Sequence, residues 1–376
     1  MQRQKQLTDW LKGQFPDTPF ELAPASADAS FRRYFRATFS DSGCDTLLPA
    51  RGRPVGTPLL RNDPSALAKP ADCGSNLHAA APAPCRGGTL IVMDAPPQHE
   101  NCRPFLHIAK LFEDAGTHVP HVYAHDLEQG FLLLSDLGNT TYLQALNMNN
   151  ARELYGAATD ALIAIQLASR ENELPSYDEA LLLREMRLFP EWYIAKHLQV
   201  ELDEKQITTL ETVFQRIIKN NLAQPRVYVH RDYHSRNLMV DTPNPGILDF
   251  QDAVYGPITY DLASLFKDAY IRWEEADVLD WLIRYWEKAR QAGLPVHADF
   301  SEFFRDYEWV GVQRHLKVLG IFARLYHRDG KEGYLKDLPL VMDYLRRACE
   351  RYIDLKPLLL LLDQLEARKP EVGFTF

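Results

Sequence analysis

Residues 230–237 read His230-Arg231-Asp232-Tyr233-His234-Ser235-Arg236-Asn237, and Asp249 follows twelve positions later within Ile247-Leu248-Asp249-Phe250. An aspartate, an asparagine five residues on, and a second aspartate after a short turn form a compact set for phosphoryl transfer. Asp232 is suited to accept the proton of an alcohol. Asn237 and Asp249 offer oxygen ligands to Mg²⁺. We therefore predict Asp232 as the catalytic base and Asn237 and Asp249 as metal ligands.

The residues around this set predict two short hairpins. Residues 226–229 and 238–240 read as strands on either side of the loop, and the turn Pro243-Asn244-Pro245-Gly246 precedes the apolar pair before Asp249. The alternative is that the three polar residues only form turns, for which aspartate and asparagine are well suited. The combination of residue types and hairpins favours the catalytic interpretation.

The same stretch carries a family resemblance. Together with Ile247–Asp252, Gly256-Pro257 and Asp261-Leu262-Ala263 it resembles the aminoglycoside phosphotransferase and choline kinase-like family. Residues 25–36, 90–97 and 313–325 are similar to the bacterial anomeric sugar kinases within that family. The resemblance covers nearly the whole chain apart from an insertion near residues 41–88. It implies a two-lobed, protein-kinase-like α+β fold, with a small β-rich N-lobe over residues 1–137 and a mostly helical C-lobe over residues 138–376.

The resemblance also implies an activity. It points to Mg²⁺-dependent transfer of the γ-phosphoryl group of ATP to the anomeric hydroxyl of N-acetylmuramate or N-acetylglucosamine, giving a sugar 1-phosphate in peptidoglycan recycling. Two alternatives stay open. One is an aminoglycoside or other small-alcohol phosphotransferase. The other is a nucleotide-binding pseudokinase scaffold, because the lysine that the family carries on its third strand is absent from residues 90–94.

Nucleotide binding is where the chain departs from the wider family. The phosphate-covering loop would be residues 25–30, which contain no glycine but offer the hydroxyls of Ser26 and Ser30. Arg32 and Arg33 are candidates to meet the phosphate charge, although both could equally be solvated strand residues. The resemblance places the adenine edge against backbone groups around Asp136.

The remaining candidate residues support the loop or bind the acceptor. We expect His230 to be a hydrogen-bonded structural residue, and Asp261 either to hold the loop or to start a helix. His234 and Arg236 line the loop. The lactyl carboxylate of N-acetylmuramate requires a cation. The helix expected at residues 299–327 offers Arg314, Lys317 and Arg324, which could equally be a solvated stripe on that helix. A polycationic aminoglycoside would instead need carboxylates, and the candidates are Glu274, Glu275, Asp277 and Asp280. The alternative is that these residues form the negatively charged first turn of a helix.

Composition limits the partners. With 42 basic and 51 acidic residues the net charge is −9, which argues against a general nucleic-acid binder. Five cysteines without a C-x-x-C pair suggest neither a zinc site nor a disulfide framework, so a reducing cytoplasm is the expected location. The first residues lack the apolar core of a signal peptide, and the apolar run at 358–362 is far shorter than the roughly 20 residues that cross a bilayer. We expect a small amino-sugar substrate, no nucleic acid and no membrane.

Hydrophobic periodicity predicts most of the secondary structure. Strands are expected at residues 31–39, 89–93 and 131–134, and helices at residues 1–15, 104–115, 151–168, 180–197, 203–220, 258–270, 275–292, 299–327 and 336–366. The segment from residue 40 to residue 88 is rich in Pro, Gly and Ala without periodicity, which indicates a disordered or loosely draped insertion. A docking or regulatory loop is the alternative.

Overall fold

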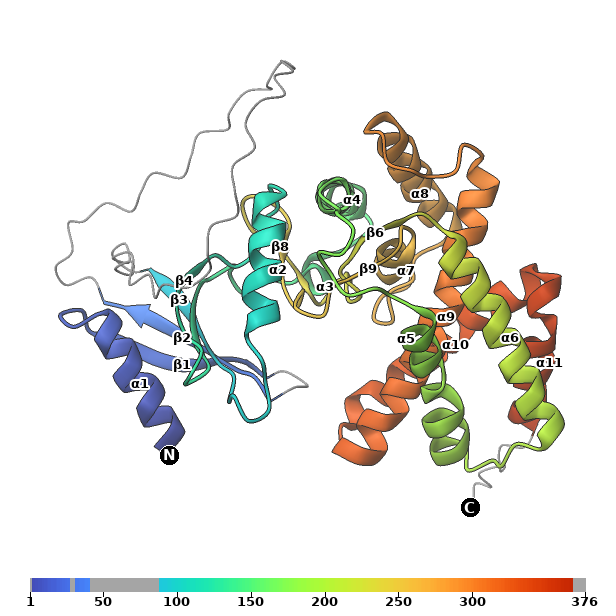
Figure 1. Cartoon of the computed structure of the whole chain (residues 1–376), viewed down its shortest axis with the longest axis horizontal. Helices are drawn as coiled ribbons and strands as arrows, with labels where there is room; N and C mark the ends of the chain where they lie inside the picture. Colours follow the sequence, from blue (N-terminus) through green and yellow to red (C-terminus); the bar gives the residue numbers. More distant parts are fainter. Residues whose placement is uncertain (1, 28–30, 41–87, 368–376) are drawn as a thin grey trace. The chain divides into compact units, whose positions relative to one another are not determined.

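A computed structural model describes residues 2–27, 31–40 and 88–367 of the chain (Figure 1). The predicted insertion lies outside these residues except for Gly88, and so does Ser30. The chain divides into an N-terminal unit (Met1–Leu106 and Pro120–Asp136) and a C-terminal unit (His107–Val119 and Leu137–Phe376). The first unit is built on a sheet and the second is mostly helical, which confirms the predicted fold class.

The N-terminal unit contains a five-stranded antiparallel sheet in the order β1-β2-β3-β5-β4. Its strands are β1 (Phe20–Ala27), β2 (Arg33–Phe39), β3 (Thr89–Asp94), β4 (Val122–Asp126) and β5 (Phe131–Ser135). Strands β2, β3 and β5 lie within one or two residues of their predicted positions. The sequence did not reveal β1 and β4, each of which contains a register shift. Strand β1 continues to Ala27, so the first half of the predicted phosphate-covering loop belongs to this strand.

Helix α1 (Gln2–Gln14) packs on one face of this sheet, as Figure 1 shows. Leu7, Leu11 and Phe15 recur at helical spacing and face alternate strand residues, because side chains two apart on a strand share a face. Together they form the core of the unit, whose other buried members are Phe35, Ala37, Phe39, Leu90, Val92, Phe131 and Leu133.

The C-terminal unit is organised around the helix α9 (Phe300–Asp329), which packs against α5, η1, α6, α7 and α10. Its helices are α3 (Tyr142–Ala145), α4 (Ala151–Leu167), α5 (Glu179–Met186), the π-helix η1 (Phe189–His197), α6 (Glu204–Ala223), α7 (Tyr260–Phe266), α8 (Glu275–Gln291), α9, α10 (Leu338–Arg351) and α11 (Lys356–Ala367), with short 3₁₀ helices η2 (Glu332–Asp337) and η3 (Ile353–Leu355). Helix α2 (Arg103–Asp114) begins in the N-terminal unit and ends in the C-terminal unit.

Two predicted helices are wrong in their extent. The helix expected at residues 180–197 is α5 followed by the π-helix η1. Leu188, between the two, lies against Gly320 of α9, and a Cβ added to Gly320 would lie 2.4 Å from the backbone of Leu188. The helix expected at residues 336–366 is divided between α10 and α11, and its break precedes Pro357. A proline is tolerated in the first turn of a helix but not in its interior.

Two short two-stranded sheets, of which only the second is a hairpin, carry the predicted catalytic loop. Strand β6 (Arg226–Val229) pairs with β9 (Val254–Pro257), and β7 (Leu238–Met239) pairs with β8 (Gly246–Ile247). The loop 230–237 leaves β6 and enters β7, while residues 248–253 connect β8 to β9. Pairing therefore brings two segments together that lie more than ten residues apart in the chain.

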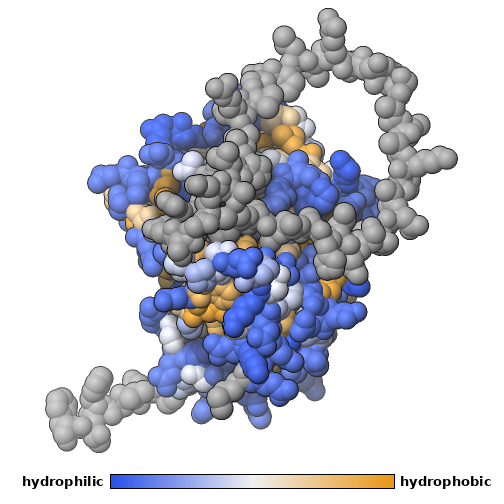
Figure 2. Space-filling view, turned by 90° about the vertical axis from the view of Figure 1, so that its left-hand side faces the viewer, coloured by the Kyte–Doolittle hydropathy of each residue, from blue (hydrophilic) through white to orange (hydrophobic). Residues whose placement is uncertain are grey.

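The visible surface in Figure 2, apart from the residues drawn in grey, is mainly hydrophilic with small hydrophobic areas between charged residues. Such scattered apolar area is normal for a folded protein. In the described part of the chain, no helix combines the length and the apolar character that crossing a membrane requires.

Candidate active site

Two buried aspartates hold the loop 230–237 at both ends. Asp261 on α7 accepts hydrogen bonds from the backbone N–H groups of His230 (2.7 Å) and Arg231 (3.0 Å). Asp268, just beyond α7, accepts from the backbone N–H of Ser235 (3.0 Å) and from its hydroxyl. Both aspartates are at most 1% exposed. Burial raises the pKa of Asp261 to about 7, although the two N–H donors oppose that rise.

His230 lies inside this loop as a fully buried, neutral residue. The backbone N–H of Asp232 donates to its Nδ1 (3.3 Å), so the ring proton is on Nε2, which donates to the carbonyl of Leu248 (2.9 Å). Burial lowers the pKa of His230 to about 4, outweighing the attraction of the Asp232 charge. One imidazole therefore ties the catalytic loop to the residue that precedes Asp249.

The neutral state of His230 predicts a loss of stability in mild acid. Its pKa falls from 6.5 to about 4 on folding, so the unfolded chain binds the proton more tightly, and stability is complete above 6.5 and decreases as the pH falls toward 4. Between pH 7 and pH 5 we expect this residue alone to cost about 2 kcal/mol. The measurement is the free energy of unfolding in urea at both pH values.

The variant His230→Gln is the control for this pH effect. A glutamine can accept and donate as the imidazole does but does not titrate, so the loss between pH 7 and pH 5 should shrink by that amount. Any contribution of Asp261 is common to both proteins and cancels. Equal pH dependence in the two proteins would contradict the prediction.

Asn237 and Asp249 lie in contact at the junction of the two segments. Asn237 Nδ2 donates to the backbone carbonyl of Asp232 (3.0 Å) and to Asp249 Oδ2 (3.4 Å). Gln251 Nε2 donates to Asp249 Oδ1 (2.8 Å). Asp249 has φ of 62°, a left-handed conformation that short polar side chains tolerate. The hydrogen bonds thus fix the position of both side chains.

This pair has the chemistry of a magnesium site. The amide nitrogen of Asn237 is occupied by hydrogen bonds, which makes its Oδ1 the atom suited to a cation, beside the carboxylate of Asp249. The described residues contain no cluster of three or more His, Cys, Asp or Glu side chains that could enclose a metal alone. Mg²⁺ is commonly held by one or two carboxylates together with substrate phosphates, and the pair fits that role.

Asp232 is surrounded by positive charge. Its backbone carbonyl is fixed by Asn237 Nδ2 and by the backbone N–H of His234 (3.0 Å). Burial would raise the pKa of its carboxyl, but Lys317, His234, Arg314 and Arg231 lower it to below its ordinary value. The carboxylate is therefore ionised at neutral pH and able to accept a proton.

A buried ion network lies beside Asp232, and the sequence analysis did not identify its centre, Glu185 on α5. Glu185 pairs with Lys317 Nζ (3.1 Å) and with the guanidinium of Arg231, and it accepts hydrogen bonds from Gln313 (3.0 Å) and Tyr177. Burial would raise the pKa of Glu185, but the two cations lower it overall. Because one carboxylate neutralises Lys317 and Arg231 together, removing it would leave two buried charges without a partner.

The predicted nucleotide-binding residues lie in the N-terminal unit. Arg32 faces Glu100 at 3.6 Å, and Arg33 pairs with the fully buried Asp94, to which Arg3 of α1 also donates (2.9 Å). Arg36 donates through Nε and Nη2 to both carboxylate oxygens of Asp136. Ser26 lies in β1. Both predicted arginines thus already face a carboxylate in this unit.

The predicted acceptor residues differ in their surroundings. His234 stacks edge-on against Tyr270 (5.4 Å between centroids), and the guanidinium of Arg236 lies 3.6 Å above the same ring. Lys317 belongs to the Glu185 network, whereas Arg324 lies ten residues after Arg314 on α9, about 15 Å along the helix axis. Arg314 is 3% exposed and its Nη1 has no hydrogen-bond partner in the described part of the chain.

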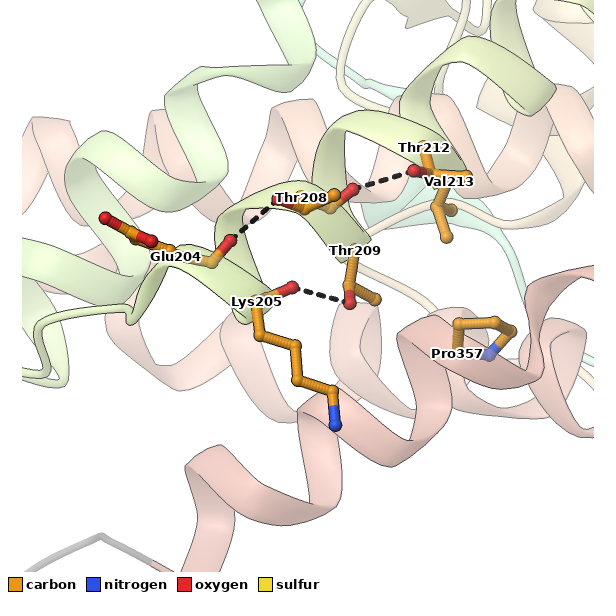
Figure 3. Close-up of a pocket in the computed structure, with 7 residues that line it drawn as sticks. All are labelled: Glu204, Lys205, Thr208, Thr209, Thr212, Val213 and Pro357. Carbon is orange, nitrogen blue, oxygen red and sulfur yellow. Dashed lines mark hydrogen bonds between the residues drawn. The ribbon is translucent and has the colours of Figure 1, made fainter.

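A shallow pocket elsewhere in the C-terminal unit is not a competing site. It lies on α6 beside Pro357 of α11, and three of its seven lining residues are threonines (Figure 3). Thr208, Thr209 and Thr212 each donate their hydroxyl proton to the backbone carbonyl four residues earlier, at 2.8 Å. These hydroxyl protons are satisfied by the helix itself, and the pocket contains none of the predicted site residues.

Comparison with known proteins identifies the family of this chain. Residues 84–300 match the model of the phosphotransferase enzyme family. The chain is 46% identical over 381 residues to an N-acetylmuramate/N-acetylglucosamine kinase of Neisseria meningitidis serogroup B, covering 100% of both chains, and 45% identical over 379 residues to one of Pseudomonas aeruginosa, covering 98% of this chain and 97% of that one. In structure it is similar to a choline/ethanolamine kinase family protein of Mesorhizobium loti, with a TM-score of 0.55, 11% identity and coverage of 95% of this chain and 99% of the other. The predicted resemblance is confirmed, and the chain belongs to the phosphotransferase enzyme family.

Proposed function

We propose that this chain is an ATP-dependent kinase that phosphorylates the anomeric hydroxyl of N-acetylmuramate and N-acetylglucosamine, forming the sugar 1-phosphate for cytoplasmic recycling of peptidoglycan. The observation that carries the proposal is the hydrogen-bonded set of Asp232, Asn237 and Asp249. The relatives that match this chain over nearly its whole length are named N-acetylmuramate/N-acetylglucosamine kinase.

In the proposed reaction Asp232 accepts the proton of the anomeric hydroxyl while the sugar oxygen forms a bond to the γ-phosphorus. The bond from that phosphorus to the bridging oxygen breaks, and ADP leaves with the electron pair. Asn237 Oδ1 and the Asp249 carboxylate would hold Mg²⁺, which supplies charge neutralisation at the phosphates. The lowered pKa keeps Asp232 ionised but makes it a weaker base, and an anomeric hydroxyl, being more acidic than an ordinary alcohol, requires less basic strength.

The charge around Asp232 supports a neutral or anionic acceptor. Three cations act on this carboxylate: Arg231, Arg314 and Lys317. Their positive charge would repel a polycationic aminoglycoside. Of the four acidic residues considered for such a substrate, Glu275 pairs with Arg351 and Asp280 pairs with Arg284, and all four lie at the N-terminal end of α8. That position favours their role as the negatively charged start of a helix over an aminoglycoside site.

For the nucleotide, we propose that Arg32 or Arg33 exchanges its carboxylate partner for an ATP phosphate, with Ser26 and Ser30 as further donors. The small residues before Ser30 permit close backbone approach. Since the carboxylate of Asp136 is engaged by Arg36, we propose that only the backbone near Asp136 meets the adenine edge.

The experiment that tests the function is ADP formation by the purified full chain with ATP and Mg²⁺ in the presence of each amino sugar. Phosphorus NMR of the product should show an anomeric 1-phosphate. Turnover only with choline or an aminoglycoside, or phosphate at another sugar carbon, would refute the proposal. ATP binding without any turnover would favour the scaffold alternative.

A further inference from the structure

The buried middle of α9 carries four polar side chains, Gln313, Arg314, His315 and Lys317, with different degrees of compensation. Gln313 and Lys317 both bind Glu185, at 3.0 Å and 3.1 Å. Arg314 is equally buried, yet its Nη1 has no hydrogen-bond partner, and no described carboxylate forms an ion pair with it. The Asp232 carboxylate acts on this charge but leaves Nη1 without a hydrogen bond, and a buried donor without a partner is costly. This cost indicates a guanidinium whose partner is a ligand.

The geometry of α9 fixes the direction in which Arg314 lies. Successive helix residues are about 100° apart, so Lys317 and Phe322 flank Arg314 on either side of the helix at roughly 60° and 80°. Lys317 reaches Glu185, which holds Arg231 at one end of the catalytic loop. Phe322 packs on Tyr270, whose ring contacts His234 near the other end. Arg314 therefore faces the part of the loop between these contacts, where Asp232 lies.

We propose that Arg314 binds the lactyl carboxylate of N-acetylmuramate and so selects this sugar over N-acetylglucosamine. The inference rests on the proposed function. The two sugars share their ring and N-acetyl group, and they differ by the lactyl ether at C3, whose carboxylate is the only charge on either. That carboxylate lies within one sugar ring of the reacting hydroxyl, which matches a cation beside the base. A planar guanidinium can bind a carboxylate through two parallel hydrogen bonds.

The neighbouring cations are less suited to this role. Lys317 already forms an ion pair with Glu185, and the guanidinium carbon of Arg236 lies over the Tyr270 ring, 3.6 Å from its centroid. The other anion that Arg314 could meet is the phosphoryl group in transfer. These two ligands are distinguishable, because both sugars require the phosphoryl group and only one brings a carboxylate.

The test is the substrate preference of Arg314→Met, which keeps the apolar stem and removes the charge. Losing a charged hydrogen-bond partner should lower kcat/KM for N-acetylmuramate by roughly 10- to 100-fold. The value for N-acetylglucosamine should fall far less, so that the ratio of the two values falls at least roughly tenfold, because only N-acetylmuramate brings a carboxylate. The matched control is Arg305→Met, an exposed arginine on the same helix, which should leave both values unchanged.

Three outcomes decide the matter. An equal loss for both sugars assigns Arg314 to the phosphoryl group or to Asp232 and overturns the proposal, while the proposed function stands. An unchanged preference overturns it as well. If the wild-type chain phosphorylates neither sugar, the proposed function itself is refuted.

If thermal melting shows that Arg314→Met is unfolded, the variant Arg314→Lys tests the proposal instead. It keeps the charge but not the planar fork, and it should lower the preference for N-acetylmuramate, whereas an unaltered preference would overturn the inference.

Discussion

Replacing Asp232 with asparagine should lower kcat by roughly 10²- to 10⁴-fold, the range over which a positioned general base acts. The change removes the proton acceptor but keeps the shape of the side chain. The loop should retain its conformation, because Asn237 and His234 bind the backbone carbonyl of residue 232 rather than its carboxylate. ATP affinity should therefore stay within about threefold of that of the unaltered chain, since no ground-state contact is lost.

The measurements are ADP formation with saturating amino sugar and nucleotide affinity by calorimetry. The control is Asp160→Asn, which changes an exposed aspartate of α4 paired only with Lys288 and should have normal turnover. Because cations hold the pKa of Asp232 below its ordinary range, its protonation should not limit the rate above about pH 5. Turnover retained within tenfold in Asp232→Asn would show that another group accepts the proton.

Replacing Asp249 with asparagine should lower kcat at least roughly 100-fold and raise the Mg²⁺ concentration needed for half-maximal rate, because a charged oxygen ligand is exchanged for a neutral one. The loop should remain folded, since Asn tolerates the left-handed backbone at this position and φ is 62°. The measurement is the rate as a function of Mg²⁺ concentration. Partial recovery at high Mg²⁺ is expected.

A control separates metal binding from packing in this variant. Gln251→Ala removes the side chain that donates to Asp249 Oδ1 without removing a metal ligand, so its Mg²⁺ requirement should shift far less. If Asp249→Asn has a normal Mg²⁺ requirement and loses only stability, the carboxylate is structural and the proposed metal site is wrong.

The parts of the fold that sequence reveals are those with a clean period. Strands β2, β3 and β5 alternate or are continuously apolar, and α1, α4, α6, α8 and α9 repeat every three to four residues. Strand β1 contains Pro24 and small residues, and β4 is only partly buried, so neither carries a hydrophobic pattern. The division before η1 depends on the approach of Gly320 from a distant helix. The break before Pro357 had a local signal, since a proline inside a periodic run often marks a new helix start.

In the candidate site, too, residues close together in the sequence could be predicted, whereas residues that reach the site from distant parts of the chain could not. Asp232, Asn237 and Asp249 lie within eighteen consecutive residues, and their spacing alone identifies them. Glu185 and Asp268 reach the loop from 46 and 33 residues away. Their only sequence signal is a single carboxylate within or after an apolar helical stretch, and such residues are usually solvated. Which of the three cations on α9 is compensated also depends on Glu185, so the sequence left Arg314 and Lys317 equivalent.

Asp261 and Asp268, which hold the loop 230–237 through hydrogen bonds, bear on how the loop is kept in position. Both come from one short helix and its next turn, and both bind backbone or a serine rather than a mobile side chain partner. The loop is thus positioned by unmodified side chains of the C-terminal unit. Attaching a phosphate to another residue is not what sets the conformation of residues 230–235, in contrast to a loop that is ordered by phosphorylation.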